Sequence, residues 1–321
     1  PLSRYTLSPF SDFRFIIQFI KALLIHKPQL VIPYTLKPVI FSGLSFSLLR
    51  VLGFFNNSHF IPLITGLGYF FTQKLSGISA FVKYLVLSLY RLSLLYCKGI
   101  IFQNPDDLFV FNSYRLFKPS IPTLIVPGSG VDLSTYTYSV VPQQPIFLML
   151  PRLLIDKGIR EYFEAASIIR AEYPFARFLL AGMSDSSPGS ISKSSFLSLL
   201  NNKHVEYVGP VDDVLPLLEL CQCYVLPSYR EGTPRSTLEA LAVGRPIVTT
   251  DVPGCRQTVV NEKNGYLVES MSSSALASAC RKILMTPYPD LQLMGDYSHF
   301  LAEDVFDVHK VNRLILDFIG L

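Results

Sequence analysis

The sequence predicts an α/β fold organised in two domains, and three observations support this. Short apolar runs alternate with amphipathic stretches through the second half of the chain, which is typical of a parallel sheet buried on both faces. The length of 321 residues is enough for two separate cores. Apolar residues make up 50% of the chain, which excludes an intrinsically disordered protein.

The second half contains five apolar runs that we expect to be strands, at residues 146–150, 177–181, 205–208, 223–226 and 247–250. Turn residues such as Gly182, Gly209 and Pro227 end these runs. A helix is expected over residues 236–243, where Gly244 stops it. Because ligands of a doubly wound parallel sheet bind at the carboxyl ends of its strands, functional residues should follow these runs directly.

The first half is less regular. We expect a basic amphipathic helix over residues 13–25 and strands at 30–33, 60–64, 100–103 and 124–126. Asn104-Pro105 predicts a helix start, because Asn caps a helix and Pro suits its first position. The expected domains are 1–130 and 145–300, with a linker over 131–144 and a C-terminal helix in 301–321 that packs on the first domain.

Charge is distributed unevenly along the chain, although the net charge is only +4. Residues 1–140 carry 12 Lys and Arg against 4 Asp and Glu, and residues 141–321 carry 16 against 20. No acidic residue lies between Asp12 and Asp106. This asymmetry predicts an anionic partner for the first half, such as a membrane surface. The alternative is that the basic helices pack in the protein and only the charged ends of their Lys side chains reach solvent. A nucleic-acid partner is not expected, because no nucleic-acid-binding motif accompanies the basic residues.

The cysteines are five in number and scattered, and Cys221-x-Cys223 has no second pair at zinc-site spacing, so we expect reduced, mostly buried thiols in a cytosolic protein. No cluster of acidic residues predicts a metal site. No stretch predicts a membrane span, because the longest uncharged interval, residues 51–73, is broken by Asn, Pro and Gly.

The segment 227–246, PSYREGTPRSTLEALAVGRP, holds the densest group of candidate functional residues. It follows an expected strand and runs into a helix, so that Glu231 and Glu239 can face one crevice. Backbone amides of residues 232–236 would point outward at the helix start, where an anion is favoured. Such a site suits a ligand with phosphate and hydroxyl groups, for example a nucleotide sugar. A pair of Glu residues at this spacing also arises by chance on a solvated helix.

Two further clusters follow expected strands. Arg152 and Lys157 are cations five residues apart that can flank a diphosphate, although a surface pair beside Asp156 is an equal alternative. The loop Thr65-Gly66-Leu67-Gly68-Tyr69 can approach a ligand closely, although Gly-x-Gly is also an ordinary turn.

Taken together, these motifs resemble family four of the retaining glycosyltransferases, which are GT-B enzymes with two Rossmann-like domains. The resemblance is most specific over residues 227–254, from PSYREG to TDVPG, and extends to TGLGY, FQNPDD and PGSGVD. The most similar subgroup transfers N-acetylhexosamines or hexoses to polyprenyl-diphosphate-linked saccharides in bacterial surface-glycan assembly. The strand and Gly-rich loop that open these relatives are absent here, so we expect the first domain to be incomplete at its N-terminus.

The resemblance implies a role for each matching residue. Arg152 and Lys157 would bind the donor diphosphate, and Glu231 would bind sugar hydroxyls near the reacting carbon. Glu239 would bind the ribose. The segment Gly232, Thr233, Pro234 and Arg235 would hold sugar and phosphate with its backbone N–H groups, and Pro234, which has no N–H, would fix the loop. Gly66 and Gly68 would line the cleft on the acceptor side. The family needs no metal or other cofactor.

The expected function is therefore retaining transfer of a sugar from a nucleotide sugar, by resemblance a UDP-sugar, to a lipid-diphosphate-linked saccharide. The resemblance also implies a cytoplasmic location at the inner face of the plasma membrane. A nucleotide-sugar epimerase or hydrolase on the same fold is an alternative that would turn over UDP-sugars without an acceptor. The other alternative is an inactive remnant that only binds a membrane or partner and does not bind UDP.

Overall fold

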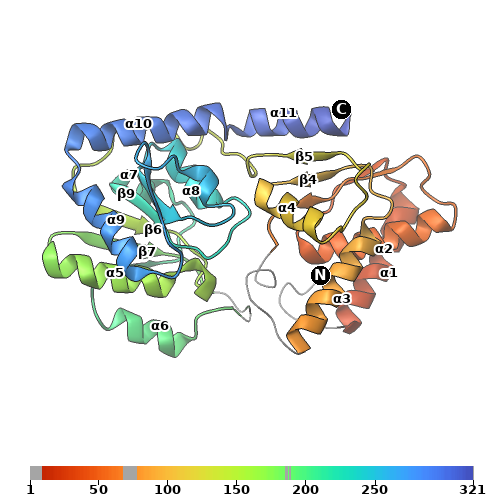
Figure 1. Ribbon diagram of the computed structural model, residues 1–321, viewed down its shortest axis with the longest axis horizontal. Helices are drawn as coiled ribbons and strands as arrows, with labels where there is room; N and C mark the ends of the chain where they lie inside the picture. Colours follow the sequence, from red (N-terminus) through yellow and green to blue (C-terminus); the bar gives the residue numbers. More distant parts are fainter. Residues whose placement is uncertain (1–8, 68–77, 185–186, 188, 321) are drawn as a thin grey trace. The chain divides into compact units, whose positions relative to one another are not determined.

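The computed structural model describes residues 9–67, 78–184, 187 and 189–320. The chain divides into two compact units (Figure 1). The first comprises Pro1–Val126 with Arg313–Leu321, and the second comprises Pro127–Asn312. Both units combine helices with parallel strands, which confirms the α/β fold class expected from the sequence.

The second unit is built on a six-stranded parallel sheet with the strand order β11-β10-β9-β6-β7-β8. Its strands are β6 (Ile146–Met149), β7 (Arg177–Ala181), β8 (Glu206–Gly209), β9 (Cys223–Leu226), β10 (Ile247–Thr250) and β11 (Gly265–Val268). Five of them are the expected apolar runs to within one residue. The sixth, β11, was not anticipated from the sequence, because this edge strand is partly exposed and opens with Gly265 rather than with an apolar run.

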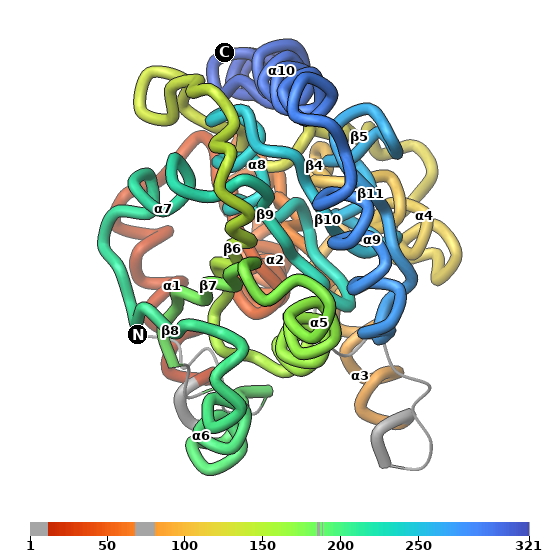
Figure 2. The backbone as a smooth tube through the Cα atoms, turned by 90° about the vertical axis from the view of Figure 1, so that its left-hand side faces the viewer, coloured from red at the N-terminus to blue at the C-terminus, as the bar shows by residue number. Residues whose placement is uncertain are grey.

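Helices cover both faces of this sheet (Figure 2). They are α5 (Ile159–Glu172), α6 (Lys193–Leu200), α7 (Leu215–Leu220), α8 (Arg235–Ala242), α9 (Ser273–Met285) and α10 (Tyr288–Asp304), with short 3-10 turns at Ile155–Lys157 and Arg256–Thr258. Helix α5 packs against α9, and α8 packs against α10. The strand order reverses between β6 and β9, so the two crossovers leave these central strands in opposite directions.

The core of the second unit lies on the central strands. All four residues of β6, β9 and β10 are buried, which explains the apolar runs of β6 and β9; in β10 the buried Thr249 and Thr250 satisfy backbone carbonyl oxygens with their hydroxyls. Phe147 of β6 stacks on Phe178 of β7 with ring centroids 4.7 Å apart. The buried Tyr162 hydroxyl donates to the carbonyl oxygens of Phe147 and Leu179, at 3.0 and 2.9 Å. These contacts join α5 to the two strands that it connects.

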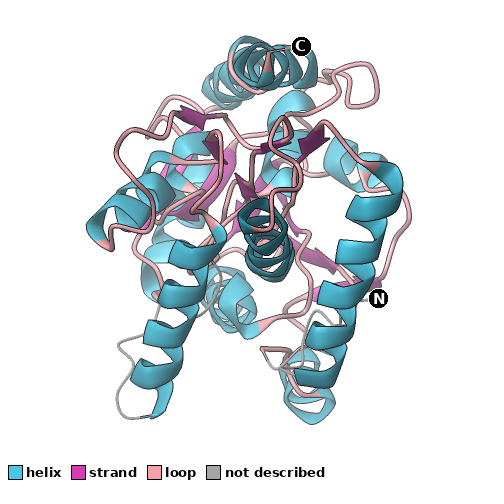
Figure 3. Ribbon diagram, turned by 90° about the vertical axis from the view of Figure 1, so that its right-hand side faces the viewer, coloured by secondary structure: helices cyan, strands magenta, loops and turns pink. Residues whose placement is uncertain are grey.

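The first unit holds shorter strands and longer helices (Figure 3). Its elements are α1 (Pro9–His26), β1 (Leu30–Val31), α2 (Leu36–Val51), β2 (His59–Phe60), β3 (Leu63–Ile64), α3 (Ile78–Ser93), β4 (Ile100–Phe102), α4 (Pro105–Ser113) and β5 (Thr123–Ile125). The strands pair in parallel as β1-β2 and β3-β4-β5. The run expected at 60–64 is split around Pro62, which lacks the amide that a continuous ladder requires.

Helix α4 begins where the sequence predicted a helix start. The side chain of Asn104 accepts a hydrogen bond from the amide of Asp107 at 2.8 Å, and Pro105 occupies the first helical position. The chain ends in α11 (Val308–Ile319), whose residues from Arg313 onward belong to the first unit. There the ring of Phe318 lies so close to Gly99 that a Cβ atom at Gly99 would be 2.8 Å from it.

The five cysteines are all buried free thiols, as the sequence predicted. Cys97 belongs to the first unit, and the other four belong to the second. Burial raises the pKa of each thiol above its ordinary value. These residues therefore act as small apolar core residues.

Gly158 controls how closely the loops after β6 and β9 approach each other. Its φ of +74° lies in the left-handed region, and a Cβ atom there would be 2.1 Å from the carbonyl oxygen of Pro227. Gly209 has a φ of +95°, but a Cβ atom there would meet nothing within 4 Å. Substitution of the two glycines therefore distinguishes the effect of steric overlap from that of backbone strain.

We expect Gly158→Ala to lower the free energy of unfolding by about 3 kcal/mol, because backbone strain and steric overlap with Pro227 both contribute. Gly209→Ala should lower it by about 1 kcal/mol, because only backbone strain contributes there. Urea unfolding of both variants measures the difference. Equal losses would contradict the close approach of the two loops.

Candidate functional site

The candidate site forms where β6 and β9 end, at the reversal point of the sheet. Lys157 follows β6 and Glu231 follows β9, and the Nζ atom of Lys157 lies 2.5 Å from Oε1 of Glu231. Their side chains are only 13% and 14% exposed. Two residues 74 positions apart in the chain, both expected from the sequence to be functional, thus form a largely buried ion pair.

Backbone hydrogen bonds hold the two loops together. The amide of Tyr229 donates to the carbonyl oxygen of Asp156 at 2.8 Å, which connects the β9 loop to the β6 loop. The amide of Glu231 donates to the carbonyl oxygen of Pro253 at 3.0 Å, in the loop after β10. Gly254 permits this packing, because a Cβ atom there would lie 2.5 Å from the carbonyl oxygen of Glu231. Three consecutive loops therefore fix the position of Glu231.

The charges around the ion pair influence one another. Burial alone would lower the pKa of Lys157, but the negative charges of Glu231 and Asp156 outweigh it and raise that pKa. Burial raises the pKa of Asp156, Glu231 raises it further, and Lys157 and Arg152 oppose the rise. Lys157 therefore stays protonated between two carboxyl groups, and it carries the positive charge that a bound anion would need.

The N-terminus of α8 points out of the same edge of the sheet. The helix begins at Arg235, and the residue that precedes it is Pro234, whose side chain has no atom that could cap the helix. The partial positive charge of a helix N-terminus favours an anion. The segment from Gly232 to Pro234 leads into α8, which begins within one residue of the helix start expected from the sequence.

Glu239 lies one turn further along α8 and is nearly buried, with 9% of its side chain exposed. The Nε atom of Arg235 donates to Oε1 of Glu239 at 3.0 Å. Burial raises the pKa of Glu239, and the neighbouring Tyr136 and Arg235 oppose the rise. Burial, together with the charge of Glu239, raises the pKa of Tyr136 to about 12. Tyr136 was not expected at the site, because it lies in the stretch predicted as a linker.

The remaining expected residues lie at different places. Arg152 is exposed, and its charge acts on Lys157 and Asp156. Gly66 follows β3 in the first unit and has a φ of +112°, in the left-handed region. Gly68 lies outside the described residues. The ion pair, α8 and Arg152 all belong to the second unit, whereas the Gly66 loop belongs to the first.

The arrangement can bind a ligand that carries both negative charge and hydroxyl groups. Lys157, Arg152 and the α8 N-terminus supply positive potential, and Glu231 and Glu239 supply carboxylates that accept hydrogen bonds from hydroxyls. Within the described part of the chain, no three His, Cys, Asp or Glu side chains gather as a metal site would require. Over the same residues, no helix combines the length and apolarity needed to cross a bilayer.

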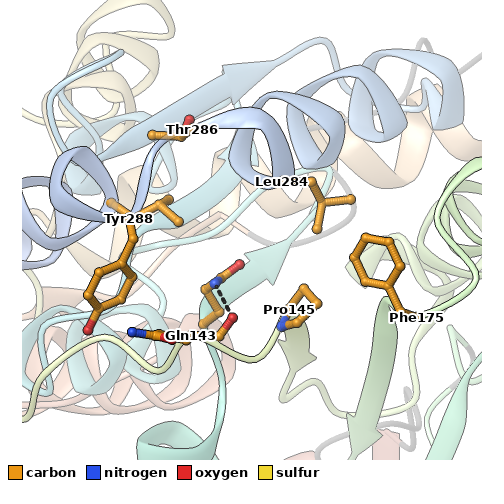
Figure 4. A pocket seen from close by; sticks show the side chains of 8 residues that line it. Gln143, Pro145, Phe175, Leu284, Thr286 and Tyr288 are labelled. Atoms are coloured by element: carbon orange, nitrogen blue, oxygen red, sulfur yellow. Dashed lines mark hydrogen bonds between the residues drawn. The ribbon is translucent and has the colours of Figure 1, made fainter.

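A cavity of about 340 Å³ opens elsewhere on the second unit (Figure 4). Its lining includes Pro145, Phe175 and Gln222, each of which precedes a strand of the sheet, together with Leu284 and Tyr288. It therefore lies at the amino ends of the strands, opposite to the ion pair. Ligands of a doubly wound sheet bind at the other end, so we do not assign the candidate site to this cavity.

We expect Lys157→Met to lower the free energy of unfolding by about 2 kcal/mol at pH 7.5, because it removes the ammonium that offsets the charges of the Asp156 and Glu231 carboxylates. The pKa of Asp156 in the folded protein is above its ordinary value. Ionisation of Asp156 therefore destabilises the fold as the pH rises through this raised pKa. Acidification protonates Asp156 and relieves its repulsion with Glu231. The loss should therefore shrink at pH 5.

Urea unfolding at both pH values measures this effect. Arg177→Met is the matched control, because Arg177 pairs with Glu206 at 2.7 Å with both side chains 46% exposed. We expect that control to cost less than about 1 kcal/mol at either pH. A loss for Lys157→Met that does not depend on pH would contradict the proposed charge coupling.

Comparisons with known proteins extend these observations. A Campylobacter jejuni protein named N,N'-diacetylbacillosaminyl-diphospho-undecaprenol alpha-1,3-N-acetylgalactosaminyltransferase is 30% identical over 237 residues, which cover 69% of this chain and 60% of that protein. The capsular polysaccharide biosynthesis glycosyltransferase CapM of Staphylococcus aureus is 32% identical over 133 residues, which cover 41% of this chain and 35% of that protein. The chain thus spans less than two thirds of the length of either relative.

Solved structures share the fold at low sequence identity. Sucrose-phosphate synthase from Thermosynechococcus elongatus superposes with a TM-score of 0.80 at 21% identity, over 97% of this chain and 77% of that chain. Anabaena Alr3699/HepE in complex with UDP-glucose superposes with a TM-score of 0.77 at 16% identity, over 100% and 86%. The family model described as "Glycosyl transferases group 1" matches residues 138–298, which hold the ion pair and α8. This chain belongs to the group 1 glycosyltransferase family.

Proposed function

We propose that this protein is a retaining glycosyltransferase that moves a sugar from a UDP-sugar to a lipid-diphosphate-linked saccharide. The observation that carries the proposal is the Lys157–Glu231 ion pair beside the N-terminus of α8, at the carboxyl ends of β6 and β9. Membership of the group 1 family supports sugar transfer. The Anabaena structure with UDP-glucose supports a UDP-sugar donor.

Each side chain then has one task in donor binding. Lys157 and Arg152 bind the diphosphate, together with amides at the start of α8. The buried carboxylate of Glu239 accepts hydrogen bonds from the ribose hydroxyls. Glu231 binds hydroxyls of the donor sugar close to the reacting carbon, while it stays paired with Lys157. The two residues of the ion pair thus bind the two parts of the donor, Lys157 the diphosphate and Glu231 the sugar.

The chemistry follows from this placement. The bond between the anomeric carbon and the diphosphate oxygen breaks, and the acceptor oxygen bonds to the same carbon on the same face. The departing diphosphate takes the acceptor proton, so no protein base is required. Lys157, Arg152 and the helix N-terminus stabilise the negative charge that develops on the leaving group. In this way two cations and a helix N-terminus provide the positive charge that a metal ion provides in other transferases.

The acceptor belongs to the same proposal. The Campylobacter jejuni relative is named as a transferase to a diphospho-undecaprenol-linked sugar, and the Staphylococcus aureus relative is named for capsular polysaccharide biosynthesis. A lipid diphosphate is anionic and lies at a membrane, which agrees with the basic first unit. We therefore propose a role in surface-polysaccharide or glycoconjugate synthesis.

We expect Lys157→Ala and Glu231→Ala each to reduce sugar transfer by about a hundredfold or more, because each removes a group that stabilises the transition state. The assay measures UDP release from a panel of UDP-sugars with an undecaprenyl-diphosphate-linked sugar as acceptor. Glu206→Ala is the control, since it breaks an exposed ion pair of the same unit.

Three results would overturn the proposal. Full turnover in either site variant would show that the ion pair is not the reaction centre. Turnover of a UDP-sugar without acceptor, at the rate seen with it, would indicate a hydrolase or an epimerase. Absence of UDP binding in a thermal-shift titration would indicate an inactive protein.

We further propose that the first unit binds the cytoplasmic face of an anionic membrane. On α1, Phe13, Ile17 and Leu24 are exposed at spacings of four and seven residues, so they share one face of the helix. Arg14 and Lys21 are exposed beside them. Leu23, about 100° around the helix from Leu24, packs in the core. An exposed apolar stripe flanked by cations suits the surface of an anionic bilayer.

Helix α3 repeats this pattern, with Phe81 and Tyr84 about 70% exposed. Both helices pack against α2. The acidic residue nearest to the stripe, Asp12, is neutralised by Lys37, whose Nζ lies 3.1 Å from Oδ1. The surface therefore carries net positive charge, and each basic residue adds about 1 kcal/mol near anionic lipid.

We expect the protein to float with vesicles rich in phosphatidylglycerol and not with neutral vesicles, because the basic residues are attracted only to an anionic surface. Arg14→Gln combined with Lys21→Gln should reduce binding by about tenfold or more, because two charges are lost. Phe13→Ser should also weaken it, whereas Phe175→Ser, equally exposed on the second unit, should not. Binding that does not depend on salt or on anionic lipid would contradict the proposal.

A further inference from the structure

Ser228 contacts the ion pair and is fully buried. Its hydroxyl donates to Oε1 of Glu231 at 2.7 Å. Lys157 donates to this same oxygen at 2.5 Å. Within the described residues no hydrogen bond is donated to the other oxygen, Oε2. The two carboxylate oxygens of Glu231 thus have different surroundings before any ligand binds.

The backbone of Ser228 is fixed from the neighbouring strand. Its carbonyl oxygen accepts a hydrogen bond from the Oγ1 atom of Thr250, at the end of β10. Thr250 is itself buried. The Ser228 hydroxyl is therefore fixed in position relative to the sheet, and it orients the Glu231 side chain relative to the neighbouring strands β9 and β10.

Other buried hydroxyls of the second unit behave differently. Ser298 donates to the carbonyl oxygen of Arg245 at 2.7 Å, and Thr249 donates to that of Leu226 at 2.7 Å. Both satisfy backbone groups and so stabilise the fold. Ser228 instead donates to an ionisable side chain of the candidate site. This contrast separates it from hydroxyls that only complete the packing of the unit.

We infer that Ser228 is a positioning residue that orients Glu231, so that Oε1 engages Lys157 and Oε2 faces the donor sugar. The inference rests on the proposed function. With the hydroxyl present, Glu231 shares one oxygen between Ser228 and Lys157. Without it, the carboxylate can rotate and bind the Lys157 ammonium with both oxygens. Sugar hydroxyls then lose their acceptor.

The test compares binding of UDP with binding of a UDP-sugar by isothermal titration calorimetry. The sugar probes are UDP-N-acetylgalactosamine, UDP-N-acetylglucosamine and UDP-glucose, and the one that the unaltered protein binds most tightly is used. We expect Ser228→Ala to change the Kd for UDP by less than about twofold and to weaken the UDP-sugar about tenfold, as loss of a hydrogen bond to a charged group predicts. In the transfer assay kcat should also fall by about tenfold or more.

A second measurement shows whether Ser228 acts through Glu231. In a Glu231→Ala background, Ser228→Ala should add no further loss of UDP-sugar affinity, because the group that it orients is gone. Ser298→Ala is the matched control, being an equally buried serine with a hydrogen bond of the same length. It should lower thermal stability without changing the preference for the UDP-sugar over UDP.

The outcomes distinguish this inference from the proposed function. If the unaltered protein binds no UDP, the proposed function fails and the inference fails with it. If it binds UDP and transfers sugar while Ser228→Ala behaves like the unaltered protein, only the inference is overturned. Equal weakening of UDP and UDP-sugar, or additive losses in the Glu231→Ala background, would also overturn it by showing a purely structural role.

Discussion

The ion pair between Lys157 and Glu231 is the interaction on which the rest of the site depends. Each charge is costly to bury alone, so each loop can keep its residue in the interior only if the other loop supplies a partner. The close contact at Gly158, the hydrogen bond from Tyr229 to Asp156 and the packing of Gly254 on Glu231 all serve this pairing. The backbone of three loops is thus adapted to keep one ammonium and one carboxylate in contact.

The parallel sheet explains why this pairing forms at all. Both residues follow strands that lie next to each other, with Leu148 in register with Tyr224, so loops from distant parts of the chain leave the same edge together. The start of α8 leaves this edge as well, and its amides add to the positive potential. A site for anions with hydroxyl groups therefore needs only a few specialised residues, because strand order and helix direction provide the remainder.

The sequence predicted those parts of the site that directly follow apolar runs. Lys157, Glu231 and Glu239 could be located because their strands and helix are signalled by local patterns. Ser228, Asp156 and Tyr136 could not, because their roles arise from contacts across the sheet or with a segment that lacks regular structure. The pattern also missed β11, an edge strand without a continuous apolar run, and it did not show that Pro62 divides the strand expected at 60–64.

The burial of all five thiols has a practical consequence. A cysteine that is buried and has a raised pKa does not react with an alkylating reagent until the structure around it opens. Cys97 reports on the first unit, and Cys221, Cys223, Cys255 and Cys280 report on the second. Mass spectrometry of alkylated peptides would therefore give a separate opening rate for each unit from one sample, without any introduced label.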